Sequence, residues 1–362
     1  MPEGQGGGWG LKLMEAFWEK LRSMGVPAVH LGVSKANENA VGFYKHIGYH
    51  VISEHDWGYM LGKKLEPGKD ATKRLQDRVA FEKLAKTHNL DASASSIFAI
   101  SEPCLHLAST ISRDEDIPVG ASKFGGDPDV PLGFEWPYWQ NSFLSLLLQV
   151  NLSELQALFP TTDLPKTGLL SIFFEHNNDA VFMNPDDQES FQVYYFDKTD
   201  SLRRTNSPET PKFQFSYPPC KVEFKISRSF PSPISKVLHN VGMSDWEIDS
   251  SYSDLYYGHL ELSNPKHQIF GHPFIHQDDD FGIKSQLLSN RISLKNNFVF
   301  TDESMSNKRK GAEDWILFFQ IDTDTNTQMH WGISEGTLYF VIRKEQLEMH
   351  NFTEICLLRQ YI

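Results

Sequence analysis

The sequence predicts an α+β fold in two parts, and three observations support this. Residues 10–65 alternate between helix-like and strand-like segments, and a short polar stretch follows them. From about residue 98 onward, short apolar segments are separated by Pro, Gly and Asn, and one series of these segments occurs twice. We therefore predict a small mixed α/β region followed by a larger α+β domain with an internal duplication.

The composition is that of a packed protein in a reducing compartment. The chain has 362 residues, of which 40% are apolar and 13% aromatic, so two separate cores are possible. No apolar run approaches the roughly 20 residues that span a membrane, and the N-terminus lacks the pattern of a signal peptide. Cys104, Cys220 and Cys356 are few and widely spaced, which favours a cytoplasmic location over a disulfide framework.

The negative charge lies entirely in the second part of the chain. Residues 1–66 hold seven basic and seven acidic side chains, so the remainder holds 34 − 7 = 27 basic and 47 − 7 = 40 acidic ones, which accounts for the net charge of −13. Such a surface repels phosphate backbones, so nucleic-acid binding is not expected. Solubility is the simplest role for this acidity.

The first part contains a regular alternation of elements. Apolar residues at helical spacing (Leu11, Met14, Phe17, Trp18 and Leu21) predict a helix over 10–24, which Gly25 and Pro27 end. A strand over 29–33, a helix over 37–47 and two strands over 49–52 and 57–65 follow. Residues 67–71 are the predicted linker between domains 1–66 and 72–362. A helix over about 72–87 then follows, with Leu75, Val79, Phe81 and Leu84 on one face.

Three segments of the second part repeat in the same order, which is the basis for the predicted duplication. FGGDP at 124–128 is matched by FGHP at 270–273. LLLQVN at 146–151 is matched by LFFQID at 317–322, and GLLSIF at 168–173 is matched by GTLYFV at 336–341.

The N-terminus carries a pattern typical of a diphosphate site. A glycine-rich segment opens directly into the first helix, where free backbone N–H groups and the helix dipole favour an anion. Glycines let the backbone approach such a ligand closely. The residues of this segment are Gln5, Gly6, Gly7, Gly8, Trp9 and Gly10.

This segment and the Asn-led helix together resemble the GNAT family of N-acetyltransferases. Gln5, Gly8 and Gly10 match the Q/R-x-x-G-x-G/A signature. The second signature is matched by Asn37, Ala40, Phe43, Tyr44, Gly48 and Tyr49. The resemblance implies that residues 5–10 hold the diphosphate of acetyl-CoA and that Asn37 contacts the pantetheine or fixes the loop near it. It also implies that Tyr44 protonates the leaving thiolate, which is needed once an amine has attacked the thioester.

The chain departs from the GNAT pattern because only Met1 to Gly4 precede Gln5. In the family, the preceding strands supply the acceptor-side wall and often the general base, and their loss exposes a sheet edge. Three explanations are open: a truncated chain start, a partner chain that completes the sheet, or a relic that serves as a structural cap. The amine acceptor and the base are not identified by the sequence.

Residues 72–362 resemble the YwqG-like family, a family without an assigned activity. The resemblance is carried by the segments SKFGGDPDVP at 122–131, EWP at 135–137, LLLQVNLSEL at 146–155, LPKTGLLSIFF at 164–174, DWILFFQID at 314–322 and WGISEGTLYFVIRKEQL at 331–347. It implies an α+β fold and no particular chemistry.

Gln149 and Gln320 are the polar residues most out of place in this domain, because each interrupts an apolar strand. A buried amide must form hydrogen bonds, so each either ties down a neighbouring loop or faces a ligand in a cleft between the duplicated halves. The only His/carboxylate cluster is formed by His272, His276 and Asp278 to Asp280. Its loop setting favours a solvated turn, so no metal is predicted.

Two hypotheses about function follow. In the first, the chain is an acetyl-CoA-dependent N-acetyltransferase that carries a YwqG-like domain. In the second, it is a non-enzymatic binding protein in which the YwqG-like domain is the working part and the GNAT segment is vestigial.

Overall fold

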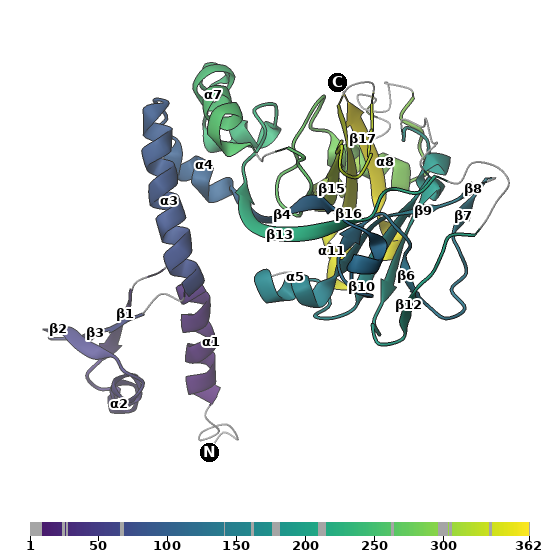
Figure 1. The fold of residues 1–362 in the computed structure, drawn as a ribbon. Helices are drawn as coiled ribbons and strands as arrows, with labels where there is room; N and C mark the ends of the chain where they lie inside the picture. Colours follow the sequence, from purple (N-terminus) through teal and green to yellow (C-terminus); the bar gives the residue numbers. More distant parts are fainter. Residues whose placement is uncertain are drawn as a thin grey trace. The chain divides into compact units, whose positions relative to one another are not determined.

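The computed structural model of the chain divides into two compact units, Met1–Phe98 and Ala99–Ile362 (Figure 1). Each unit is described by itself below. The residues described are 9–23, 26, 28–65, 69–140, 142–160, 163–175, 182–208, 215–261, 264–295, 303, 306–332 and 335–361.

The first unit contains a three-stranded antiparallel sheet and four helices, in the order that the sequence predicts up to residue 65. Strand β3 lies between β1 and β2 and pairs with both. The elements are α1 (Trp9–Ser23), β1 (Ala28–Ser34), α2 (Glu38–His46), β2 (His50–His55), β3 (Gly58–Lys64), α3 (Lys69–Thr87) and α4 (Ala94–Ile100), the last of which crosses the division between the units.

The buried face of α1 is narrower than the sequence predicts. Trp18 is buried and its indole N–H donates to the Tyr49 hydroxyl at 3.2 Å, whereas Leu11 and Phe17 are 38% and 50% exposed. Met14 and Leu21, which are partly buried, complete the helix face on this core. The helix that the spacing predicts is present, but only part of its apolar face is buried, because a small sheet covers only a narrow stripe of a helix.

Helix α3 begins at Lys69, so residues 69–71 of the predicted linker form its first turn. Phe81 packs against Phe98 of α4 with ring centroids 5.7 Å apart, whereas Val79, which the spacing places on the same apolar face, is 58% exposed. The side chain of Leu75 lies outside the described residues. The compact units divide after Phe98, and the domain boundary at 67–71 stays a prediction.

The second unit is organised by a curled ten-stranded antiparallel sheet with the order β11-β10-β9-β5-β13-β4-β14-β15-β16-β17 (Figure 1). Its strands are β4 (Glu102–Ile111), β5 (Lys123–Phe124), β9 (Ser145–Asn151), β10 (Leu169–Phe174), β11 (Phe191–Phe196), β13 (Cys220–Ser229), β14 (Gln268–Ile269), β15 (Trp315–Asp322), β16 (Gly336–Arg343) and β17 (Cys356–Tyr361). Two further two-stranded antiparallel sheets pair β6 (Asp129–Pro131) with β12 (Leu202–Arg204) and β7 (Tyr138–Trp139) with β8 (Ser142–Phe143).

Short helical segments connect these strands. The α-helices are α5 (Leu152–Leu158), α6 (Asp245–Glu247), α7 (Ser253–Leu255), α8 (Phe281–Ser289), α10 (Ser306–Arg309) and α11 (Lys344–Glu348). The 3₁₀ turns are η1 (Asp114–Asp116), η2 (Pro185–Ser190), η3 (Lys236–Val241), η7 (Ala312–Asp314) and η8 (Phe352–Glu354), and η4 (Ile248–Tyr252) and η5 (Tyr256–Leu260) are π-helical.

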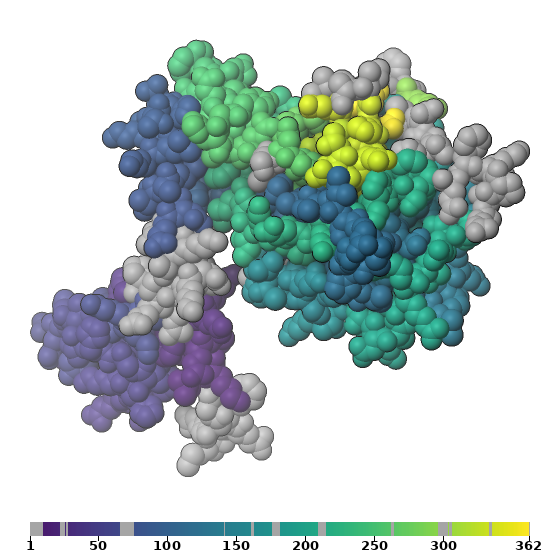
Figure 2. Space-filling view, viewed as in Figure 1, coloured from purple at the N-terminus to yellow at the C-terminus, as the bar shows by residue number. Residues whose placement is uncertain are grey.

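The strand order confirms the internal duplication, because it has the same pattern from both ends. The long strands β4 and β13 form the centre, and outward from them β5, β9, β10 and β11 correspond to β14, β15, β16 and β17. One main core cluster contains residues of both halves. On the face drawn in Figure 2, the teal first half and the green-to-yellow second half of this unit abut.

The structure corrects the sequence alignment of the two copies at one position. Gly125, rather than Phe124, corresponds to Phe270, because both donate their N–H to the neighbouring strand at 3.1 Å and both have positive φ, of 56° and 61°. The motif comparison had equated Phe124 with Phe270, which was wrong by one position. Gly126 and Gly271 then correspond, with φ of 69° and 78°. A left-handed conformation at Phe270 is unusual for a bulky residue, and the sequence does not signal it.

A buried polar junction joins the central strands to the second copy. His267 is fully buried, and its Nε2 lies 3.3 Å from Asp324 Oδ2. The Ser109 hydroxyl on β4 donates to the same carboxylate oxygen at 2.6 Å. Burial by itself raises the pKa of Asp324, but the hydrogen bonds from His267, Ser109 and the Asn326 backbone outweigh it and lower the pKa to about 2.

We predict that this junction makes stability depend on pH in the acid range. Asp324 has a folded-state pKa of about 2 against an ordinary 3.8, so its contribution is complete above pH 3.8 and is lost as the pH falls towards 2. The shift corresponds to a free energy of unfolding of about 2 kcal/mol. Urea unfolding of Asp324→Asn should show a loss of that order at neutral pH and a shallower acid dependence. The exposed Asp249→Asn is the control, and equal acid dependence in both variants would contradict this prediction.

Candidate functional site

The candidate acyl-transfer residues of the first unit lie at the start of α1 and along α2. Gln5, Gly6, Gly7 and Gly8 lie outside the described residues, and of Trp9 only the backbone is described. Helix α1 begins at Trp9 and has no acidic residue in its first turn. Its first four N–H groups have no partner within the helix, so this end attracts negative charge.

Gly10 brings the start of α1 against α2. A Cβ atom at Gly10 would lie 3.3 Å from the Phe43 ring, so a larger residue would press on that ring. Phe43 is adjacent to Tyr44, and their ring centroids are 5.4 Å apart. The glycine at position 10 therefore has a packing role, and it places the anion-attracting helix end close to the turn that carries Tyr44.

Asn37 is the N-cap of α2. Its Oδ1 accepts the backbone N–H of Ala40 at 3.2 Å, which satisfies one of the free donors at the start of that helix. Of the two roles that the resemblance implies, this geometry favours the fixing of the local backbone over direct contact with pantetheine.

Tyr44 is partly buried against the core of the first unit. Its ring packs edge-on against Tyr49 with centroids 5.4 Å apart, and Gly48 ends the helix with a φ of 94°. Within the described residues the Tyr44 hydroxyl makes no hydrogen bond. The ring is therefore held in place while the hydroxyl remains able to donate a proton.

Gln149 and Gln320 occupy equivalent positions in the two copies and make equivalent bonds. Gln149 accepts the Asp129 N–H at 3.2 Å and donates to the Ala121 carbonyl at 2.7 Å. Gln320 accepts the Phe274 N–H at 2.8 Å and donates to the Lys266 carbonyl at 2.7 Å. Both side chains are fully buried. This geometry favours the loop-tethering interpretation, since both ends of each amide bond to protein groups.

The first copy contains a buried ion cluster that the sequence analysis missed. Lys123 is fully buried, with its Nζ 2.6 Å from Asp114 Oδ1, and Arg204 Nε lies 2.9 Å from Asp129 Oδ1. Burial lowers the pKa of Lys123 even though its ion pair with Asp114 raises it. The sequence around Lys123 gives no signal of this cluster, because Arg204 and Asp129 come from other strands.

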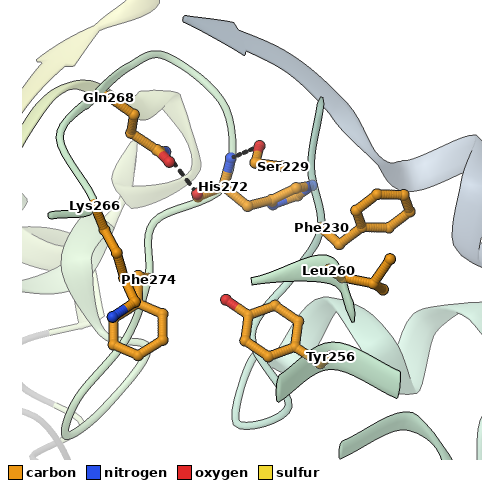
Figure 3. Close-up of a pocket in the computed structure, with 8 residues that line it drawn as sticks. All are labelled: Ser229, Phe230, Tyr256, Leu260, Lys266, Gln268, His272 and Phe274. Atoms are coloured by element: carbon orange, nitrogen blue, oxygen red, sulfur yellow. Dashed lines mark hydrogen bonds between the residues drawn. The ribbon is translucent and has the colours of Figure 1, made fainter. Parts of the chain in front are cut away.

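The second copy replaces this cluster with a small hollow. Its volume is about 10 Å³, room for about one water molecule, and it is lined by Ser229, Phe230, Tyr256, Leu260, Lys266, Gln268, His272 and Phe274 (Figure 3). Gln268 stands where Lys123 stands in the first copy, and it donates to the His272 carbonyl at 2.8 Å as Lys123 donates to the Asp127 carbonyl at 2.6 Å. Phe274 replaces Asp129.

The polar groups around the hollow are already bonded to protein. Lys266 Nζ lies 2.8 Å from Glu261 and 4.3 Å from the centroid of the Phe274 ring. Ser229 accepts the His272 N–H at 2.7 Å, and the His272 ring lies 2.6 Å from the Ile100 carbonyl (Figure 3). We therefore assign no ligand to this hollow.

The side chains of the His/carboxylate cluster are also engaged with other parts of the protein. His276 Nε2 lies 3.0 Å from the Thr337 hydroxyl, Asp278 pairs with Lys284 at 2.6 Å, and Asp279 accepts from Ser235 at 2.9 Å. A search of the described residues finds no group of three His, Cys, Asp or Glu side chains arranged to hold a metal ion. In the same residues no helix has the length and apolarity of a membrane span.

The hydrogen bonds of Gln149 and Gln320 are expected to stabilise the fold. Changing either Gln149 or Gln320 to Ala leaves a buried N–H and a buried C=O without a partner, so each should lower the free energy of unfolding by about 2 kcal/mol or more. Denaturant unfolding measures this loss. Gln76→Ala, at an exposed position on α3, should be close to neutral and is the control. Unchanged stability in the two buried variants would instead favour the ligand-facing interpretation.

Comparison with protein families assigns both parts of the chain. A model described as "Domain of unknown function (DUF1963)" matches residues 122–360. A model described as "Acetyltransferase (GNAT) family" matches residues 1–49. The two matches confirm the expected combination of a GNAT fragment with a YwqG-like domain.

Proposed function

Because the chain belongs to the DUF1963 family, whose function is unknown, and carries a GNAT segment beside that domain, we propose that its chemistry resides in the first unit. In this proposal the chain binds acetyl-CoA and transfers the acetyl group to an amine. The proposal includes a cytoplasmic location, which three buried free cysteines support.

The single observation that carries the proposal is the contact between Gly10 and Phe43. It brings the start of α1, which favours a diphosphate, next to the turn of α2 that carries Tyr44. The two GNAT motifs are 32 residues apart from Gln5 to Asn37, and the contact brings the helices that follow them into one local site. The GNAT match over residues 1–49 includes both motifs.

Each described residue has a definite task in this proposal. Acetyl-CoA supplies an acetyl group activated as a thioester, whose transfer to an amine forms a C–N bond and breaks the C–S bond. Backbone N–H groups at the start of α1 bind the diphosphate, and Asn37 holds the start of α2 in place. Tyr44 donates its hydroxyl proton to the departing sulfur, and the proton that the attacking amine loses returns through solvent to the tyrosinate. Packing against Tyr49 fixes the direction of the ring.

Acetyl-CoA binding is the first test. We expect saturable binding of acetyl-CoA to the full chain by isothermal titration calorimetry, with an affinity of about micromolar order that falls as salt rises, because the diphosphate is held by an electrostatic field. Binding of desulfo-CoA with similar affinity would locate the contact at the nucleotide end. Absence of binding by a folded chain would contradict the proposal and transfer the search for function to the second unit.

Tyr44→Phe tests the assignment of the proton donor. Since only the hydroxyl is removed, acetyl-CoA affinity should change little, whereas kcat with a reactive primary amine should fall by about 10²-fold. Release of free thiol measures the rate. Tyr59→Phe, a tyrosine on β3 outside the GNAT motifs, is the matched control. Equal rates for wild type and Tyr44→Phe would remove this role from Tyr44.

A further inference from the structure

Lys63, on β3, lies between the two helices that carry the proposed acyl-transfer site. Its Nζ is 3.9 Å from the centroid of the Trp18 ring on α1. The same ammonium group donates a hydrogen bond to the backbone carbonyl of Ile47, the residue that ends α2. One partly buried side chain therefore joins β3, α1 and α2 at a single point.

Both contacts of Lys63 depend on its positive charge. The face of an indole ring is electron-rich and attracts a cation within about 6 Å. The last carbonyl groups of a helix have no partner within the helix and carry partial negative charge, which also favours a cation. A neutral side chain of similar length would keep the packing of the methylene groups and lose both electrostatic contacts.

Gly48 leaves the space that this ammonium group occupies. A Cβ atom at position 48 would lie 2.8 Å from Lys63 Nζ, and the φ of Gly48 is 94°, a conformation that other residues rarely adopt. Gly48 is one of the residues that match the second GNAT signature. Because this glycine has no side chain, Lys63 can reach the end of α2.

The contacts of Lys63 are connected to Tyr44 along two routes. The first is the end of α2 itself, where the Tyr49 N–H donates to the Tyr44 carbonyl at 2.9 Å, just after Ile47. The second runs through side chains: the Trp18 indole donates to the Tyr49 hydroxyl at 3.2 Å, and the Tyr49 ring packs edge-on against Tyr44. The direction of the Tyr44 ring is therefore coupled to both partners of Lys63.

We propose that Lys63 is a positioning residue for acyl transfer: its ammonium group holds α1 and α2 together so that the Tyr44 hydroxyl faces the sulfur of acetyl-CoA. This inference rests on the proposed function. Trp18 lies nine residues after Trp9, about 14 Å along α1 from the end that favours the diphosphate. Lys63 therefore acts on the proton donor and not on the affinity for acetyl-CoA.

Three variants isolate this role. Lys63→Met removes the charge and keeps the length of the side chain, whereas Lys63→Arg keeps a cation. Lys64→Met, at the exposed next position on β3, is the matched control for the loss of one positive charge. Since Lys63 is only partly buried, we expect all three variants to fold, and circular dichroism verifies this.

The first measurement is acyl transfer to a reactive primary amine, in the wild-type chain and in the Tyr44→Phe background. We expect Lys63→Met to lower kcat about tenfold with unchanged acetyl-CoA affinity by calorimetry, Lys63→Arg to recover most of the rate, and Lys64→Met to behave as wild type. In the Tyr44→Phe background, Lys63→Met should cause no further loss, because its effect passes through the missing hydroxyl. Equal losses in both backgrounds, or a loss of acetyl-CoA affinity specific to Lys63→Met, overturn the proposal.

The second measurement needs no turnover. The chain is labelled with fluorotyrosine, and the fluorine NMR resonance of Tyr44 is assigned by its loss in Tyr44→Phe. We expect Lys63→Met to shift or broaden this resonance and Lys64→Met to leave it unchanged. An unchanged Tyr44 resonance in Lys63→Met overturns the proposal, even if the wild-type chain transfers acetyl groups. A shifted resonance in a chain that binds no acetyl-CoA confirms that Lys63 positions Tyr44 and contradicts the proposed function, so the two failures are distinguishable.

Discussion

The second unit depends on one constraint: Gln149 on β9 and Gln320 on β15 are buried, so each side-chain amide must form hydrogen bonds with other protein groups. In both copies it accepts a backbone N–H from the segment after the glycine turn, and it donates to a backbone carbonyl just before the short strand β5 or β14. A buried amide without hydrogen-bond partners would be strongly destabilising, so detachment of these backbone segments from the glutamine would lower the stability of the fold. The glutamine and its two backbone partners are therefore a more specific feature of the duplicated unit than its hydrophobic strands, because hydrophobic positions tolerate many substitutions.

Divergence between the copies is concentrated next to these glutamines. Where the first copy has Asp129 paired with the guanidinium of Arg204, the second has Phe274 beside the ammonium of Lys266, which pairs with Glu261. An aromatic ring thus stands in the second copy where the first has a carboxylate. The ion cluster fills the first position, and the hollow lies at the second. Because a buried ion cluster is weak support for stability, its retention in one copy is better explained by specific positioning of β6, β12 and the turn at Asp114.

The first unit presents a different balance, because few of its described side chains are fully buried. Its local geometry is nevertheless well defined: Asn37 caps α2, Gly48 ends it, and Tyr44 packs between Phe43 and Tyr49. The balanced charge of residues 1–66 contrasts with the acidic remainder of the chain.

The sequence by itself determined the order of elements in the first unit, the GNAT motifs and the existence of a duplication, because periodicity and glycine positions are local signals. It also singled out Gln149 and Gln320, since an amide within an apolar strand is conspicuous. Only the tertiary structure decided what these amides bind, because Ala121 and Lys266 approach them through strand pairing across long sequence separations. The same reason explains the missed partners of Lys123, the exposure of Phe17 and Val79, and the one-residue shift at Phe270: each depends on which surface a neighbouring strand or helix covers, and no local pattern encodes that choice.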